Sequence, residues 1–150
     1  MKITNVILLG LLISFLSCKK DTQKNTEITA ETKEISLLDT LTLKLDNGKK
    51  WVVNNETQIG IMKMDSIISE FKKDQTKDYS NLGKDLSIQT GYIIKSCNME
   101  GEAHDQLHVV LVPMLDEISN LKESNIKEEN ERALSDLEVL IDEYFNHFKL

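Results

Sequence analysis

Apolar side chains recur every three to four positions over residues 54–150, which is the period of an α-helix with one buried face. Short polar segments divide the pattern into four stripes, and short connections between long amphipathic helices favour antiparallel neighbours. The sequence therefore predicts an all-α fold, an antiparallel up-down four-helix bundle at residues 54–150. The stripes consist of Ile61, Met64, Ile68 and Phe71; Tyr79, Leu82, Leu86, Ile93 and Cys97; His104, Leu107, His108, Leu111, Leu115 and Ile118; and Leu134, Leu137, Ile141, Tyr144, Phe145 and Phe148.

Polar residues before these stripes predict where the helices begin. Asn54 or Asn55 can cap the first helix, and Asp78 can cap the second, because short polar side chains accept from the free N–H groups of a first turn. Asn125 and Glu128 have the spacing of a capping box. We therefore expect a fourth helix to start there.

Three glycines and the single proline interrupt the predicted helices. Gly60, Gly83 and Gly91 each cost about 1 kcal/mol relative to Ala inside a helix. Close approach of a neighbouring helix can offset this cost, or the helix can bend there. Pro113 removes one backbone donor and should kink the third helix.

Residues 36–53 have a different pattern. Apolar residues alternate over Leu41–Leu45, Asp46–Gly48 supplies residues that tolerate positive φ, and Trp51–Val53 is apolar again. Such a sequence predicts a small β-hairpin, which must pack on the bundle, with Trp51 as its anchor, because a lone hairpin is marginal in water. The alternative is an extended segment that lies along the bundle.

The N-terminus has the pattern of a secretory signal. A short basic start precedes an apolar run over Val6–Leu16, and this run is shorter than the roughly 20 residues that span a bilayer as a helix. Residues 1–17 are therefore predicted to be a signal peptide. Residues 18–35 are rich in Thr, Lys, Glu and Asn and are predicted to be a disordered tether.

The end of the apolar run carries a more specific motif. Phe15-Leu16-Ser17-Cys18 resembles the lipobox of bacterial lipoproteins, with Phe15 in place of the commoner Leu. The resemblance implies cleavage before Cys18, a diacylglycerol thioether on its sulfur and a further acyl chain, such as palmitate, on the new N-terminus. Several acyl chains anchor a protein stably to a membrane.

The net charge bears on the partners of the chain, and the residue after the lipobox bears on its location. The chain has 18 Lys+Arg against 25 Asp+Glu, a formal net charge of -7, which argues against nucleic acid as a partner. Lys19 stands where, by resemblance to known lipoproteins, an Asp would favour retention in the inner membrane. The expected location is therefore the bacterial cell envelope, with the outer membrane favoured; no protein partner can be named.

Potential metal ligands cluster at one predicted end of the bundle. His104 and His108 lie four residues apart, so both fall on one face of the third helix, within its apolar stripe. Cys97 and Met99 end the second helix and begin the turn, next to the start of the third. His147 near the end of the fourth helix is a possible additional ligand.

These side chains are soft donors. Thiolate, thioether and imidazole suit Cu(I), and thiolate with imidazole also suits Zn(II). The sequence therefore predicts copper, with zinc second, at Cys97, His104 and His108, with Met99 as a weaker fourth ligand. Sequestration or transfer of the ion is the expected role.

Two alternatives remain open at this stage. A His on an apolar stripe is commonly a core residue, so the chain can instead be a structural or protein-interaction lipoprotein without a ligand. A haem between Met64 and His147 is a distant third, suggested by a resemblance to haem-binding four-helix bundles. No catalytic motif such as Gly-x-Ser-x-Gly or His-Glu-x-x-His occurs, so we do not expect an enzyme.

Overall fold

The computed structural model describes residues 37–150. The predicted signal peptide, the lipidated Cys18 and the predicted tether lie outside these residues. The described part contains the short helix α1 (Leu37–Thr40) and four long helices. These are α2 (Asn55–Lys73), α3 (Tyr79–Ser96), α4 (Gly101–Glu123) and α5 (Lys127–His147). The prediction of a mostly helical chain with four long helices is confirmed.

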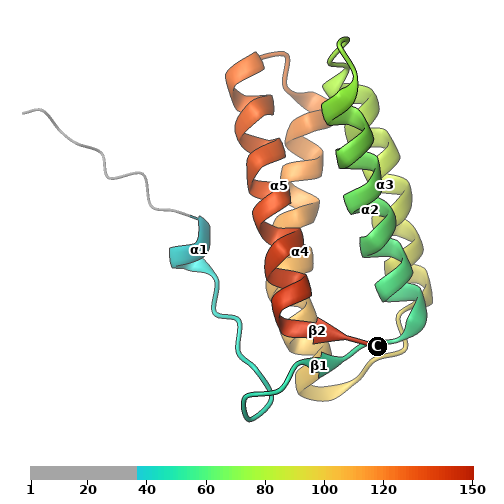
Figure 1. Cartoon of the computed structure of the whole chain (residues 1–150), viewed down its shortest axis with the longest axis vertical. Coiled ribbons are helices and arrows are strands. Elements are labelled where there is room, and N and C mark those ends of the chain that lie inside the picture. The colour runs from blue at the N-terminus through green and yellow to red at the C-terminus, as the bar shows by residue number, and fades with distance from the viewer. Residues whose placement is uncertain (1–36) are drawn as a thin grey trace, which may run out of the picture. The chain divides into compact units, whose positions relative to one another are not determined.

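The long helices lie side by side (Figure 1). α3 packs extensively on α2 and on α4, and α4 packs on α5, whereas α2 and α5 touch much less. Figure 1 places the α2–α3 and α4–α5 connections at the top and the α3–α4 connection at the bottom. The start of α4 therefore lies at the same end as the end of α3.

A continuous core of apolar side chains fills the space between these helices. Its fully buried members include Ile61 and Met64 of α2, Leu86 of α3 and Leu137 of α5, as the helical spacing predicts. The predicted stripe of α4 is confirmed in part. Leu107, Leu111 and Ile118 are buried as expected, and His104 is half-buried at the edge of this face, whereas His108 is exposed. The helix also buries Val110, Met114 and Leu121.

Two of the helical glycines allow close helix contacts. A Cβ atom at Gly60 would overlap the side chain of Ile93, and one at Gly83 would lie 3.0 Å from the backbone nitrogen of Lys122. The expected close approach is therefore present at both positions. A Cβ at Gly91 would meet no atom of the described residues within 4 Å. Pro113 does not end α4, which continues to Glu123.

The segment before α2 forms only the turn of the expected hairpin. Asn47 and Gly48 both have positive φ, 47° and 82°, and they join an isolated antiparallel bridge between Asp46 and Lys49. No ladder extends from this bridge. Leu41 and Leu43 instead pack against the core.

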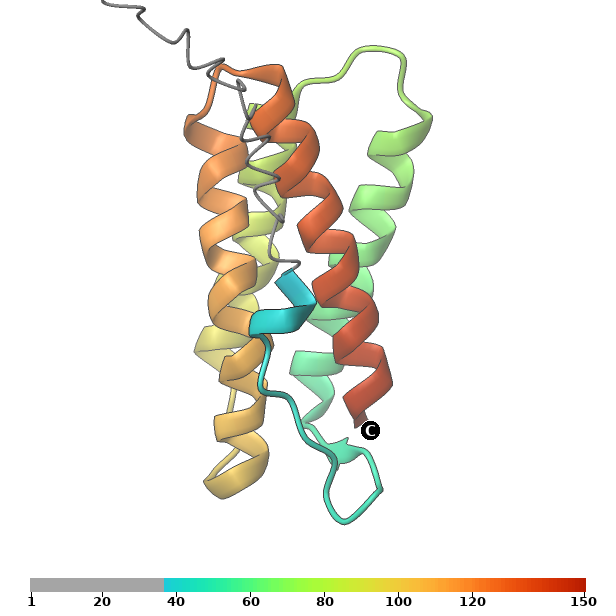
Figure 2. The ribbon, with the colours of Figure 1, turned by 90° about the vertical axis from the view of Figure 1, so that its left-hand side faces the viewer.

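Trp51 and Val52 find a partner at the far end of the sequence. β1 (Trp51–Val52) pairs in parallel with β2 (Phe148–Lys149), with Trp51 opposite Phe148. The fourth helix therefore ends at His147, and Phe148 is a strand residue rather than the last member of a helical stripe. Figure 2 shows the lead-in running down one side of the bundle to its lower end.

The structure confirms the predicted cap of α3 and contradicts the predicted cap of α5. Asp78 caps α3, because its carboxylate accepts from the N–H of Asn81 at 2.9 Å. The capping box predicted at Asn125 and Glu128 is wrong: α5 starts at Lys127. No side chain caps the first turn of α5. Ser124 instead bridges the connection, since its hydroxyl oxygen accepts from the N–H of Ile126 at 3.1 Å and its O–H donates to Glu129.

Candidate metal centre

Cys97 occupies the end of α3. Its backbone N–H donates to the carbonyl of Ile93 at 2.9 Å, which closes the last turn of the helix. The residue carries a free thiol and is half-buried against the core. The end of the helix therefore fixes the backbone position of Cys97, and the residue is partly exposed.

The three residues after Cys97 turn the chain into α4. Gly101, the first residue of α4, has φ of 68°, a conformation that glycine adopts without steric cost. This tight reversal brings the first turn of α4 beside the end of α3. His104 lies in that turn and is half-buried, whereas His108, one turn later, is exposed.

The thiol and the first imidazole are in contact. Cys97 Sγ lies 3.7 Å from His104 Nδ1, and the His104 and His108 rings lie 4.3 Å apart between centroids, tilted by 58°. The structure thus brings together three of the predicted ligands, in the order thiol, half-buried ring, exposed ring.

The sulfur–nitrogen separation fits shared coordination of one metal ion. With bonds of about 2.3 Å to sulfur and 2.0–2.1 Å to nitrogen, tetrahedral or trigonal angles place the two donors roughly 3.5–3.8 Å apart. The observed 3.7 Å lies in that range. It also fits a hydrogen bond between a thiol and an imidazole.

A complete set of ligands is not assembled. Within residues 37–150, no three His, Cys, Asp or Glu side chains are grouped closely enough to hold a metal ion. His108 would have to change rotamer to join Cys97 and His104. Its exposure leaves it free to do so.

The other two predicted ligands have different surroundings. Met99 is half-buried and packs against the core. His147 Nδ1 lies 2.9 Å from the backbone oxygen of Glu143 and 3.4 Å from its carboxylate, so this ring is engaged within its own helix. Within residues 37–150, neither Met99 nor His147 forms a hydrogen bond with Cys97, His104 or His108.

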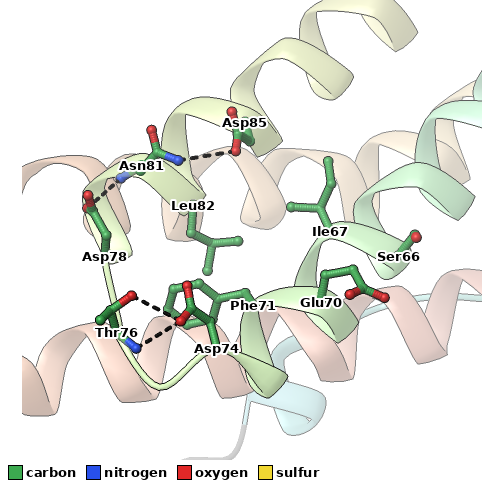
Figure 3. Close-up of a pocket in the computed structure, with 10 residues that line it drawn as sticks. All are labelled: Ser66, Ile67, Glu70, Phe71, Asp74, Thr76, Asp78, Asn81, Leu82 and Asp85. Atoms are coloured by element: carbon green, nitrogen blue, oxygen red, sulfur yellow. Dashed lines mark hydrogen bonds between the residues drawn. The ribbon is translucent and has the colours of Figure 1, made fainter.

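A cavity of about 360 Å³ lies at the other end of α2 and α3. Figure 3 shows Leu82, Ile67 and Phe71 between the two helices, with polar side chains around them. Four carboxylates line it: Glu70, Asp74, Asp78 and Asp85.

Each of these carboxylates accepts a hydrogen bond from a residue close to it in the sequence. Glu70 accepts from Lys73 Nζ at 2.8 Å. Asp74 accepts from the backbone N–H of Thr76 at 2.9 Å and from its hydroxyl at 3.0 Å, and these two bonds lower the pKa of Asp74 below its ordinary value. Asp78 caps α3, and Asp85 accepts from the side chain of Asn81. The cavity was not predicted from the sequence, in which these acids are the ordinary polar residues of a helix connection.

Comparisons with protein-family models, with curated proteins and with solved structures find no match to this chain. None of the helices within residues 37–150 is both long and apolar enough to cross a membrane.

Proposed function

We propose that this chain is a lipid-anchored protein of the bacterial envelope that binds one soft metal ion, Cu(I) in preference to Zn(II), for sequestration or transfer. In this proposal Cys97 supplies the thiolate, and His104 and His108 supply the imidazoles. Met99 and His147 are not required.

The observation that supports this function best is the 3.7 Å separation of Cys97 Sγ and His104 Nδ1. Two soft donors from the ends of two packed helices are already at the spacing of metal ligands, so little ordering is needed to bind an ion. His108 completes a three-donor set by rotating about its side-chain torsions.

The choice of copper follows from the donors. One thiolate and two imidazoles leave an ion three-coordinate, which suits Cu(I), whereas structural zinc sites are almost always four-coordinate. Zinc would need water, or a second protein, as its fourth ligand. Transfer of the ion to a partner is easier from an open site of this kind.

The anchor rests on the lipobox around Cys18 and on the polar stretch that follows it. Labelling with a palmitate analogue tests it: the wild-type chain should incorporate label and sediment with membranes, and a Cys18→Ser variant should do neither. An unlabelled wild-type chain would contradict the anchor.

We also propose the fold class in its finer form, an antiparallel up-down bundle. Short connections between successive helices and the extensive packing of each helix on the next support it. In such a bundle the end of α3 and the start of α4 meet at one pole, which is what the proposed site needs.

Metal binding is tested by anaerobic titration of residues 19–150 with Cu(I) and with Zn(II). We expect one Cu(I) per chain, and binding lost in a His104→Ala/His108→Ala variant and in Cys97→Ser. His147→Ala is the matched control, because it removes the third imidazole and should bind like the wild type. Equal binding by all four proteins would contradict the site.

The competing function is a structural or protein-interaction lipoprotein without a ligand. The exposure of His108 and the lack of an assembled three-residue group within residues 37–150 favour it. A wild-type chain that binds neither ion would support this second function.

A further inference from the structure

The 46–49 turn, β1 and β2 form the lower end of the molecule (Figure 2). Lysines and apolar residues in and next to these segments are exposed. We call this exposed set the basic end patch. It consists of Lys44, Leu45, Lys49, Val52, Lys149 and Leu150, all of them exposed. Leu45, Val52 and Leu150 are three of the nine exposed large apolar residues among residues 37–150, at 42, 62 and 62 %.

Residues far apart in the sequence build this patch. Val52 of β1 pairs with Lys149 of β2, so the C-terminus lies against the chain that leads into α2. Trp51 Nε1–H donates to the carbonyl oxygen of Lys44 at 2.6 Å. This bond holds the turn beside β1, and the patch is therefore a fixed surface rather than a loose tail.

The charge of the patch differs from that of the rest of the molecule. Among residues 41–53 and 148–150 the side chains include four lysines and a single acid, Asp46. From Asp116 to Glu143, on α4 and α5, there are ten acids and three bases. Acids at the starts of α2 and α4, such as Glu56 and Glu102, border the patch, so the positive region is confined to the turn and the strands.

We propose that the basic end patch docks on the anionic lipid surface to which the chain is anchored. Lysines near such a surface each strengthen binding about fivefold, and the exposed leucines and valine can enter the boundary between headgroups and acyl chains. The acidic surface of α4 and α5 is repelled by the same lipids, so that the bundle is oriented with this end towards the membrane.

The chain between anchor and patch is long enough. Leu37, the first residue of α1, follows Cys18 by 19 residues, which reach at most roughly 65 Å when fully extended. This docking rests on the lipid anchor of the proposed function and adds an orientation to it. Cys97 and His104 lie at the same end of the helices, so an ion bound there would be held near the membrane surface.

Trp51 reports on this docking because it is the only tryptophan of the chain. We would reconstitute the lipidated full chain into vesicles that contain brominated lipids, which quench nearby tryptophan. Vesicles with anionic phosphatidylglycerol should quench Trp51 at least twofold more than vesicles of phosphatidylcholine alone, and high salt should remove the difference.

Two variants with the same change of charge locate the contact. Lys44→Gln/Lys49→Gln/Lys149→Gln should lose at least half of the anionic-specific quenching. The control, Lys63→Gln/Lys84→Gln/Lys122→Gln, removes three exposed lysines of α2, α3 and α4 that lie away from this end and should keep it.

Equal effects of the two variants, or a larger effect of the control, would contradict docking through the basic end patch. Equal quenching in both kinds of vesicle would contradict it as well. Flotation of the vesicles separates this result from failure of the anchor. A chain that floats at high salt but shows no anionic-specific quenching contradicts the patch alone. A chain that does not float contradicts the anchor, and the docking with it.

Discussion

Glycine has two different roles in these helices. Gly60 and Gly83 lie where a neighbouring element would overlap a Cβ atom, whereas Gly91 faces open space. At the first two positions the close packing of helices offsets the helix propensity that glycine lacks. At Gly91 no contact within residues 37–150 offsets it.

Substitution by alanine should therefore change stability in opposite directions. Gly91→Ala should raise the free energy of unfolding by about 1 kcal/mol, because Ala has the higher helix propensity. Gly60→Ala should lower it by about 1–3 kcal/mol, because Ile93 must move. Urea denaturation of the two variants measures both effects, and a stabilised Gly60→Ala would contradict the helix contact.

Tyr144 joins α5 to α2, a pair of helices that packs much less closely than the helices that follow each other in sequence. Its ring is fully buried, and its hydroxyl donates to Gln58 of α2 at 3.0 Å. Burial raises the pKa of Tyr144 above its ordinary value of 10.0. Since the folded state disfavours the phenolate, Tyr144 costs the protein stability as pH rises above about 10.

Tyr144→Phe should show both consequences. Near pH 7 the free energy of unfolding of this variant should be about 1 kcal/mol lower than that of the wild type, because Gln58 loses its partner. Above about pH 10 the difference from the wild type should shrink, since only the wild type can ionise at this position on unfolding. Thermal melts between pH 7 and 11 test this, and a constant difference would contradict the burial argument.

At the scale of elements, local pattern predicts the four helices but not their partners. The spacing that identifies α2, α3 and α5 also identifies their buried faces. On α4 the spacing identifies Leu107, Leu111 and Ile118 of the buried face. It misses Val110 and Met114 and includes His108, which is exposed. Similarly, no local signal shows that Trp51 pairs with Phe148, since that pairing joins the two ends of the described chain.

The parallel pair should matter for stability out of proportion to its length. Phe148 is 2 % exposed and stacks on Tyr144 with ring centroids 5.0 Å apart. Phe148→Ala should therefore cost about 3–5 kcal/mol. Leu150→Ala is the control, because Leu150 is exposed and should change stability by no more than about 0.5 kcal/mol. Equal midpoints in urea would show that β2 does not close the core.

For the whole molecule, the sequence predicts an arrangement in which the candidate ligands share one end, and the structure places Cys97 beside His104 there. Helix spacing puts two imidazoles on one face, and a short connection puts a thiol next to them. Neither the helix spacing nor the short connection determines side-chain rotamers, so the exposure of His108 could not be predicted. Nor could the engagement of His147 with Glu143, which depends on where α5 ends.

Acid should release the ion from such a site. Metal binding requires Cys97 as a thiolate and both imidazoles uncharged, so affinity for Cu(I) should fall steadily as pH decreases from 7.5 to 5. Competition titrations at several pH values measure this. Affinity that does not depend on pH would indicate ligands other than these three.

X-ray absorption of the protein loaded with one Cu(I) tests the proposed site most directly. The expected first coordination shell has one sulfur and two imidazole nitrogens, and Cys97→Ser, which should not retain the ion, should lack this spectrum. The same spectrum from His147→Ala as from the wild type would show that the third histidine takes no part. A shell without sulfur in the wild-type protein would contradict a metal centre at Cys97, His104 and His108.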